Sequence, residues 1–542
     1  MCRLPGPDPQ ARDPVRRLEI PCPAENEVCG RSYALGMLGL ILNFFACPVV
    51  PDEVHLVVLH TNDVHGQLLS RPATWLQREG ATSGGLLRLA AKVAEVRERV
   101  EASGGFVLVL DGGDWFQGTP EGAVDGGRPF VRLLAEVGYD AMAIGNHEFD
   151  LGVEHAAELI KSMGALAVCA NVREAEERAD DLPPRVDWAP AFRVFERGGI
   201  NIAVVGMVAP ETPYITHKSA REGLRFEQPA TELERVLAEL PDEIQLVIPL
   251  THCGVEEDRI LADAFPSLPL IVGGHSHSFL RSGVRSGETL IAQAGSKASA
   301  LGRVDLHLDG DTGEVLRASA RLIDLYEEPE PSLLAHGLVD RVEALALAGE
   351  EAMGVAVGEL LDAGPESGPF RSMPIGNWMA DVMRRATGAD VGVHNRGGIR
   401  KRLVVGPLTR RDLFEVMPFD NTVVSFELSG AELLEMMGSA TDGRTQVRLE
   451  VSGMLVELEI REGRASFRNV WIDGRPVDPK GTYRLATNSF LAEGGDGVFR
   501  SLSEQRELDL LDTGTFVREA MEHDLSVRPQ LHLPVENRFV KR

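Results

Sequence analysis

The stretch HLVVLHTNDVHG, residues 55–66, combines a continuous apolar run with a polar turn that carries Asp63 and His65. Five more apolar runs follow, with helix-like segments such as residues 84–102 between them, which is the pattern of a layered α/β domain. The runs are FVLVLDG (106–112), DAMAIGN (140–146), NIAVVGM (201–207), QLVIPLT (245–251) and LPLIVGG (268–274). Later runs, TLIAQAG and GRVDLHLD, are expected to form antiparallel strands joined by the turn DGDTGE.

Five of the six runs deliver Asp, Asn or His to one edge of the predicted sheet, where α/β folds place their ligands. The residues concerned are Asp63, His65, Asp114, Asn146, His147, His252, His275 and His277. Each has a structural explanation when taken singly, because Asp and Asn cap helices and a lone His is often hydrogen-bonded structure. Oxygen and imidazole ligands from five separate loops are, taken together, typical of a binuclear metal site.

The motifs in these turns resemble those of the 5′-nucleotidase family of calcineurin-like metallophosphoesterases. NDVHG, GDWFQGTP, GNHEFDLG, THCG and GGHSH stand in the order of the family, and NRGGIR, MPFDNTVVSFELSG and NSFLAEGGDG extend the resemblance to about residue 500. The resemblance implies an α/β protein with a four-layered α/β/β/α metallophosphoesterase domain, a helical linker and a second, α+β nucleotide-binding domain. It also implies that the C-terminal domain rotates about the linker and carries substrate onto the metals.

By this resemblance, seven residues hold two divalent metal ions. Asp63, His65 and His277 would bind one ion, Asn146, His252 and His275 the other, and Asp114 would bridge them. One shared carboxylate can keep two dications about 3.5–4 Å apart, where they activate water and neutralise charge during in-line displacement at phosphorus. Because this mixed ligand set accepts Mn, Zn, Co, Fe or Mg, the sequence does not identify the metal.

The GNHEFD motif contains three further residues to which we assign roles. The resemblance implies that His147 contacts the phosphate and stabilises the transition state, while Asp150 orients its ring. A carboxylate at one ring nitrogen fixes the tautomer and favours the charged imidazolium. The alternative for Asp150 is a helix N-cap, and we expect Glu148 to brace the loop.

In the second domain, six residues match positions that contact substrate in the family. Arg371, Asn395 and Arg400 would contact phosphate and ribose, Phe419 and Phe490 would sandwich the base, and Asp496 would contact the ribose. Without the family, the two Phe residues would be interpreted as core side chains. Stacking tolerates any base, so this clamp predicts breadth more than selectivity.

Two positions depart from the usual pattern of the family. Arg396 stands where a small residue is common, and Asp420 follows Phe419 where Gly is common. If Arg396 points into the pocket, it would favour a second phosphate and shift the preference toward diphosphates or nucleotide sugars.

The charged, Pro-containing break YEEPEPS separates the two domains. We therefore expect an N-terminal extension at residues 1–51, the metallophosphoesterase domain at 52–326 and a linker helix at 327–353. The C-terminal nucleotide-binding domain would cover 354–525, and residues 526–542 would form a tail packed on the surface.

The apolar run at residues 32–50 follows Arg31 and has the layout of a signal peptide, with a membrane anchor as the alternative. We therefore expect export to the periplasm or cell surface, with membrane contact only through an uncleaved N-terminal segment. The net charge of -27 argues against binding to a nucleic-acid polymer, which requires a surface of Lys and Arg. The sequence says nothing of the oligomeric state.

These observations predict an enzyme that releases phosphate from nucleoside 5′-monophosphates, with nucleotide sugars or diphosphates as further candidate substrates. One alternative is a 2′,3′-cyclic-nucleotide 2′-phosphodiesterase/3′-nucleotidase, but that branch usually carries Asn where this chain has Asp150. Thiosulfate-releasing relatives share the metal site, but NRGGIR and the Phe pair argue against them. A more distant alternative is a surface protein that binds nucleotide or metal without catalysis.

Overall fold

The computed structural model of the chain describes residues 53–73, 80–175, 182–216, 222–328, 330–364, 368–506 and 508–541. The apolar run at residues 32–50, expected to be a signal peptide or anchor, lies outside these residues. Among the helices that are described, none has the length and apolar character needed to cross a bilayer.

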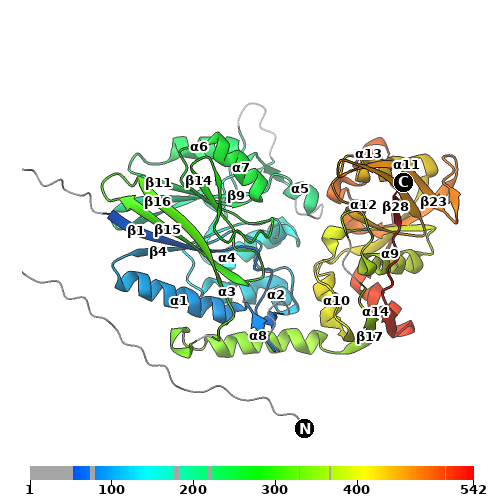
Figure 1. The fold of residues 1–542 in the computed structure, drawn as a ribbon, viewed down its shortest axis with the longest axis horizontal. Coiled ribbons are helices and arrows are strands. Elements are labelled where there is room, and N and C mark those ends of the chain that lie inside the picture. Colours follow the sequence, from blue (N-terminus) through cyan, green and yellow to red (C-terminus); the bar gives the residue numbers. More distant parts are fainter. Residues whose placement is uncertain are drawn as a thin grey trace, which may run out of the picture. The chain divides into compact units, whose positions relative to one another are not determined.

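Two six-stranded sheets form the centre of the N-terminal part (Figure 1). In spatial order, the first contains β16 (Val315–Asp324), β15 (Ala300–Asp309), β1 (Glu53–Thr61), β4 (Phe106–Asp111), β5 (Ala141–Ala143) and β6 (Ala167–Val168). The second contains β13 (Val284–Ser286), β14 (Thr289–Ala292), β12 (Leu270–Val272), β11 (Leu246–His252), β9 (Ile200–Val208) and β8 (Phe192–Arg197). The strands β1, β4, β5 and β6 run parallel, as do β9, β11, β12 and β14. Parallel strands bring their carboxyl ends to one edge, which becomes the site.

Apolar side chains of the two sheets face each other, and helices cover the outer faces (Figure 1). One outer face packs against α1 (Leu86–Ala102), α3 (Arg128–Ala135), α4 (Val153–Ser162) and α8 (Leu338–Met353). The other face packs against α6 (Pro229–Glu239) and α7 (Val255–Ala264). The predicted α/β/β/α layering is therefore confirmed.

One local prediction in this part is wrong. The run TLIAQAG forms β14, which pairs parallel with β12 and antiparallel with β13 in the second sheet. The turn DGDTGE instead joins β15 to β16 in the first sheet. Apolar alternation alone does not say which sheet a strand joins, so the sequence predicts one hairpin for TLIAQAG and GRVDLHLD although they belong to different sheets.

Shorter elements connect these layers. They are β2 (Arg71–Pro72), β3 (Thr82–Ser83), α2 (Pro120–Ala123), β7 (Val172–Glu174), α5 (Thr212–Ile215) and β10 (Leu224–Phe226). The helix α8 lies in the stretch expected to be the linker, and its residues Leu338, Val342 and Leu345 are buried in the core of the N-terminal part.

Within its described residues, the C-terminal part contains three smaller sheets. The five-stranded sheet has β21 (Leu449–Ser452), β18 (Val391–Asn395), β25 (Thr482–Asn488), β20 (Thr422–Ser429) and β26 (Leu511–Phe516). The other two have β19 (Gly406–Thr409), β17 (Ala356–Asp362) and β27 (Gln530–His532), and β24 (Arg475–Pro476), β23 (Arg464–Ile472), β22 (Leu455–Arg461) and β28 (Phe539–Lys541). The helices are α9 (Pro374–Thr387), α10 (Arg410–Val416), α11 (Gly430–Thr441), α12 (Ser489–Ala492), α13 (Arg500–Gln505) and α14 (Val517–Val527).

Local sequence explains where one of these helices begins. The helix α11 begins with a capping box, in which Ser429 accepts from the backbone of Glu432 and the Glu432 carboxylate accepts from the backbone of Ser429.

The stretch expected to be a surface tail contributes β27 and β28, which pair with β17 and β22. The last residues are thus part of the sheets of this domain.

Candidate active site

The eight polar residues at the strand ends converge on one buried centre. Asp63 Oδ1 lies 3.1 Å from His277 Nε2, and Asp114 Oδ2 lies 3.1 Å from His252 Nε2. His275 Nδ1 lies 2.9 Å from Asn146 Oδ1, and His65 Nε2 lies 3.0 Å from His277 Nε2. Groups of these side chains, within the described residues, offer metal-ligand atoms that lie within 4.8 Å of one another.

Two buried atoms at this centre have a polar neighbour 3.1 Å away but make no hydrogen bond of acceptable geometry among the described residues: Asp63 Oδ1, beside His277 Nε2, and His252 Nε2, beside Asp114 Oδ2. Unsatisfied buried polar atoms are costly, and a cation between them would satisfy both. Although burial opposes a charged ring, the carboxylates of Asp114 and Asp63 raise the pKa of His252 to about 10. The centre therefore stabilises positive charge, and its donor set fits divalent metal ions.

Backbone carbonyls fix the tautomers of two of the rings. The Nδ1 atom of His65 lies 2.8 Å from the carbonyl oxygen of Gln117, and that of His252 lies 2.6 Å from the carbonyl oxygen of Gly112. A carbonyl accepts only, so each Nδ1 must carry hydrogen, and Nε2 is the ring atom that faces the centre; His252 would release its Nε2 proton when a cation binds there. Burial also lowers the pKa of His65 well below its ordinary value, which favours the neutral ligand form.

The backbone at this centre is strained in a way that marks a functional site. Five of the seven residues predicted to bind metal have φ in the left-handed region, namely Asp63 (52°), His65 (50°), Asp114 (61°), His275 (75°) and His277 (52°). Such conformations cost about 1–3 kcal/mol each in residues other than Gly. Gly145 allows the close approach of the loops, because a Cβ atom there would lie 2.2 Å from Asp114 Oδ1.

His147 and Asp150 form a hydrogen-bonded pair beside this centre. Nδ1 of His147 donates to Asp150 Oδ2 at 2.7 Å, and Nε2 lies 3.9 Å from Asp114 Oδ2. Burial opposes the charged ring, but the carboxylates of Asp150 and Asp114 outweigh it and raise the pKa of His147. The N-cap of α4 is Gly152, so the alternative role of Asp150 as a helix cap is not observed.

The Glu148 carboxylate is completely buried and joins two of the site loops. It accepts from the backbone N–H groups of Asp114 at 3.0 Å, Trp115 at 2.7 Å and Gly145 at 2.7 Å. The bracing role expected for Glu148 therefore has a specific form, because one side chain holds the loops that carry Asp114 and Asn146.

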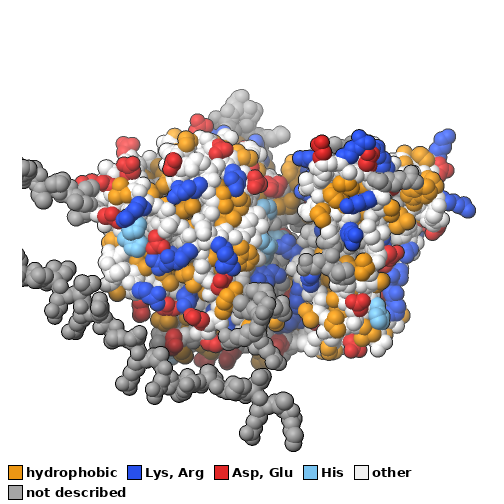
Figure 2. All heavy atoms as spheres, in the orientation of Figure 1, with side chains coloured by type: hydrophobic (Ala, Val, Ile, Leu, Met, Phe, Trp, Pro, Cys, Tyr) orange, Lys and Arg blue, Asp and Glu red, His pale blue; other side chains and the backbone are white. Residues whose placement is uncertain are grey.

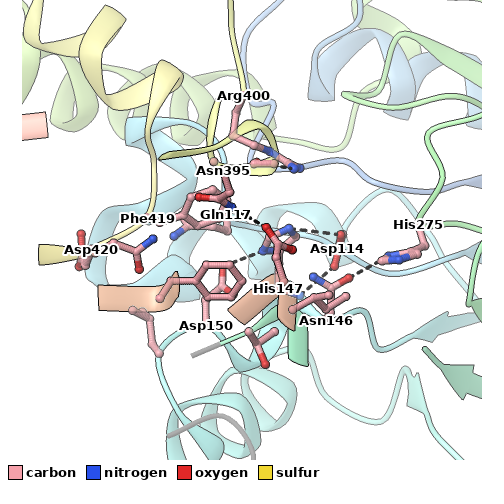
Figure 3. A pocket seen from close by; sticks show the side chains of 18 of the residues that line it. Asp114, Gln117, Asn146, His147, Asp150, His275, Asn395, Arg400, Phe419 and Asp420 are labelled. Atoms are coloured by element: carbon pink, nitrogen blue, oxygen red, sulfur yellow. Dashed lines mark hydrogen bonds and ion pairs between the residues drawn. The ribbon is translucent and has the colours of Figure 1, made fainter. Parts of the chain in front are cut away.

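A cavity of about 260 Å³ lies over this centre and is lined by residues of both parts of the chain (Figure 3). Eleven of the predicted site residues line it: Asp114, Asn146, His147, Asp150, His275, His277, Asn395, Arg400, Phe419, Phe490 and Asp496. The Phe419 ring stacks on His147, with ring centroids 5.5 Å apart, and Asn395 donates to Asp496 at 3.0 Å. Asp63, His65 and His252 are buried at the centre and do not line the cavity.

Two arginines of the C-terminal part are not among the residues that line this cavity. Arg371 is exposed. The expectation that Arg396 could point into the pocket is wrong: its Nε donates to Glu450 at 2.6 Å and its Nη2 donates to the Arg371 carbonyl. The Glu450 carboxylate is buried and needs a positively charged partner. Arg396 supplies that charge and is therefore a structural residue of the domain.

Sequence reasoning missed several residues at the site. Gln117, Leu151, Ile215, Thr216 and Asn421 also line the cavity. Gln117 lies within the quoted motif GDWFQGTP, and its side chain donates to the Pro418 carbonyl at 3.2 Å. Nothing in their sequence context marks Ile215 or Thr216, because their role arises only from the way the two parts meet.

Comparisons with known proteins agree with this geometry. The Calcineurin-like phosphoesterase family matches residues 56–279, and the 5′-nucleotidase, C-terminal domain family matches residues 356–504. The chain is 28% identical to Protein UshA of Yersinia enterocolitica, over 82% of this chain and 86% of that protein. It is 27% identical to a 5′-nucleotidase of Vibrio cholerae, over 84% and 89%. The crystal structure of a 5′-nucleotidase precursor from Thermus thermophilus is similar with a TM-score of 0.76 and 26% identity, covering 90% of this chain and 99% of that chain.

Proposed function

Because the chain belongs to the 5′-nucleotidase family of calcineurin-like phosphoesterases, we propose that it releases phosphate from nucleoside 5′-monophosphates with two divalent metal ions. The observation that carries the proposal is a single cavity with a metal-ligand cluster at one end and two aromatic rings at the other. A nucleotide has matching chemistry, with an anionic phosphate at one end and a base that stacks at the other.

Asp63, His65 and His277 would hold one metal ion, Asn146, His252 and His275 the other, and Asp114 would bridge them. When bound, such ions supply charge neutralisation and activate water for attack at phosphorus. His147, held by Asp150, directs its Nε2 toward the same centre and would donate a charge-assisted hydrogen bond to a phosphoryl oxygen. Arg400, with its Nη2 atom 3.4 Å from His65 Nε2, adds a second cation beside the phosphate.

Surface charge supports a small anionic substrate over a polymer. On the face shown in Figure 2, Lys and Arg side chains are interspersed with Asp, Glu and apolar side chains. The net charge of the chain is -27, so the favourable potential for a phosphate arises locally, from the metals and Arg400. Export to the periplasm or cell surface, through the run at residues 32–50, belongs to the same proposal.

Phosphate release from AMP, with Mn²⁺ added and again with EDTA, tests the proposal. We expect release that depends on the metal, and no release from any nucleotide would favour the alternative of a non-catalytic binding protein. Parallel assays with 2′,3′-cyclic AMP and 3′-AMP separate the second enzymatic alternative. UDP-glucose and ADP complete the panel, and the pairing of Arg396 with Glu450 removes the reason to expect that they are preferred.

A further inference from the structure

We propose that Asp420 sets the base preference of the cavity, favouring the amino bases adenine and cytosine over their oxo counterparts hypoxanthine and uracil. This inference rests on the proposed nucleotidase function. Asp420 stands where the family commonly has Gly, and it takes no part in the proposed chemistry at the phosphate.

The cavity has a polar, metal-binding end and a separate end suited to a base. Phe419 and Phe490 are the two Phe, Tyr or Trp residues among the described residues that line it, and Phe490 is 9% exposed. Asp420 and Asn421 line the cavity directly after Phe419. Figure 3 shows Asp420 beside Phe419, on the opposite side of the view from Asp114 and His275. A base that stacks on Phe419 would therefore have its edge near the Asp420 carboxylate.

Arg518 holds this carboxylate in place. Its Nη2 atom pairs with Asp420 Oδ1, and its Nη1 atom donates to the Phe419 carbonyl at 3.0 Å. The guanidinium is itself fixed over the rings of Phe414 and Phe516, at 5.3 and 4.8 Å from their centroids. The side chain of Asp420 is 51% exposed, and Oδ2 makes no hydrogen bond with the described residues. One oxygen is thus anchored, and the other remains available to a ligand.

An ionised carboxylate accepts hydrogen bonds and cannot donate them. An amino group on the base edge supplies a donor, whereas a carbonyl oxygen at the same position would face the negative charge. Asn421 cannot make this distinction, because an amide can present either its oxygen or its NH₂ group. The asymmetry between amino and oxo bases therefore comes from Asp420.

The test uses two matched pairs of substrates that differ mainly by amino against oxo: CMP with UMP, and AMP with IMP. The ratio of kcat/KM within each pair is measured for the wild type, Asp420→Asn and Asp420→Gly with Mn²⁺ at saturation. We expect wild-type ratios of about 3 to 10, below the effect of a fully buried charged hydrogen bond because the carboxylate is half exposed. Both variants should bring the ratios close to one. The exposed Asp473→Asn in the same domain is the matched control and should keep the wild-type ratios.

Each result has a distinct meaning. Wild-type ratios at or below one, or ratios that Asp420→Asn leaves unchanged, would overturn the role of Asp420 even though the enzyme hydrolyses nucleotides. If no nucleotide releases phosphate with metal present, the proposed function itself fails. Because the ratios are taken within one protein sample, a partial loss of folded enzyme in a variant cancels and leaves the conclusion intact.

Discussion

Replacing His147 with Ala should lower kcat/KM for AMP about 100- to 1000-fold while both metal ions stay bound. The ring is fixed by the 2.7 Å hydrogen bond from Nδ1 to Asp150, which leaves Nε2 facing the centre, 3.9 Å from Asp114 Oδ2. Loss of one preorganised donor to the charge of a transition state typically costs about 2.7–4 kcal/mol, which corresponds to this range of rates.

The measurement combines phosphate release from AMP at saturating Mn²⁺ with the metal content of the dialysed protein. Asp150→Asn keeps the ring of His147 but removes its charged partner, so we expect a smaller loss of about tenfold. Phe419→Leu measures how much the stacking contact contributes to the rate, since the centroid of the Phe419 ring lies 5.5 Å from that of His147. The exposed His336→Ala serves as a control for the loss of an imidazole.

A competing interpretation makes the outcome informative. His147, with His65 and Asp114, also forms one of the groups whose atoms are close enough to hold an ion. If His147→Ala loses one equivalent of metal, His147 is a ligand and the assigned role is incorrect. A variant with near wild-type rate and full metal content would equally refute the reasoning.

Three further predictions concern stability. Burial lowers the pKa of His60 to about 4, below its ordinary 6.5, so the unfolded chain binds a proton that the native state excludes between these pH values. Stability should fall by about 3 kcal/mol as the pH drops from 6.5 to 4, and His60→Leu should remove that component in urea unfolding at several pH values. Glu148→Gln should destabilise the metal-loaded protein by about 2–4 kcal/mol, because an amide cannot accept from all three backbone donors, while the exposed Glu154→Gln should not. Arg411→Met leaves the Glu121 side chain, which is 2% exposed, without its partner at 2.7 Å, and should lower the free energy of unfolding by about 3–5 kcal/mol. Adding Glu121→Gln in a double variant should restore most of that loss, whereas additive effects of the two substitutions would contradict the pairing.

The sequence predicts the position of the site well because the relevant physics is local. A buried parallel strand has a fixed end, and the residue that follows it must lie at the sheet edge. Asp63 and Asp114 follow such strands and His252 ends one, so their convergence could be predicted without knowing the order of the strands. The left-handed backbone at Asp63 and Asp114 could not be predicted, since it depends on loops that pack around the centre.

The failures have a different physical origin. Whether an arginine lines a cavity or neutralises a buried acid depends on partners far along the chain, and Glu450, 54 residues after Arg396, decided that case. The terminal strands β27 and β28 are three residues each and obtain their order from pairing with β17 and β22. Short edge strands have too little periodicity to be recognised before their partners are known.

Under the proposed function, a cavity lined by both parts of the chain would couple substrate binding to chemistry. In the proposed function, the phosphate would lie against the N-terminal part and Arg400, and the base against the C-terminal part. Gln117, Glu121 and Lys297 join the two parts through Pro418, Arg411 and the Arg400 carbonyl. A substrate that engages both ends stabilises the arrangement in which Arg400 and Phe419 approach His147, so binding energy at the base contributes to positioning at the phosphate. A free phosphate monoester without a base can engage only one end and cannot supply that contribution. Selectivity for nucleotides would then appear in kcat as well as in KM, although no group that contacts the base takes part in the reaction at phosphorus.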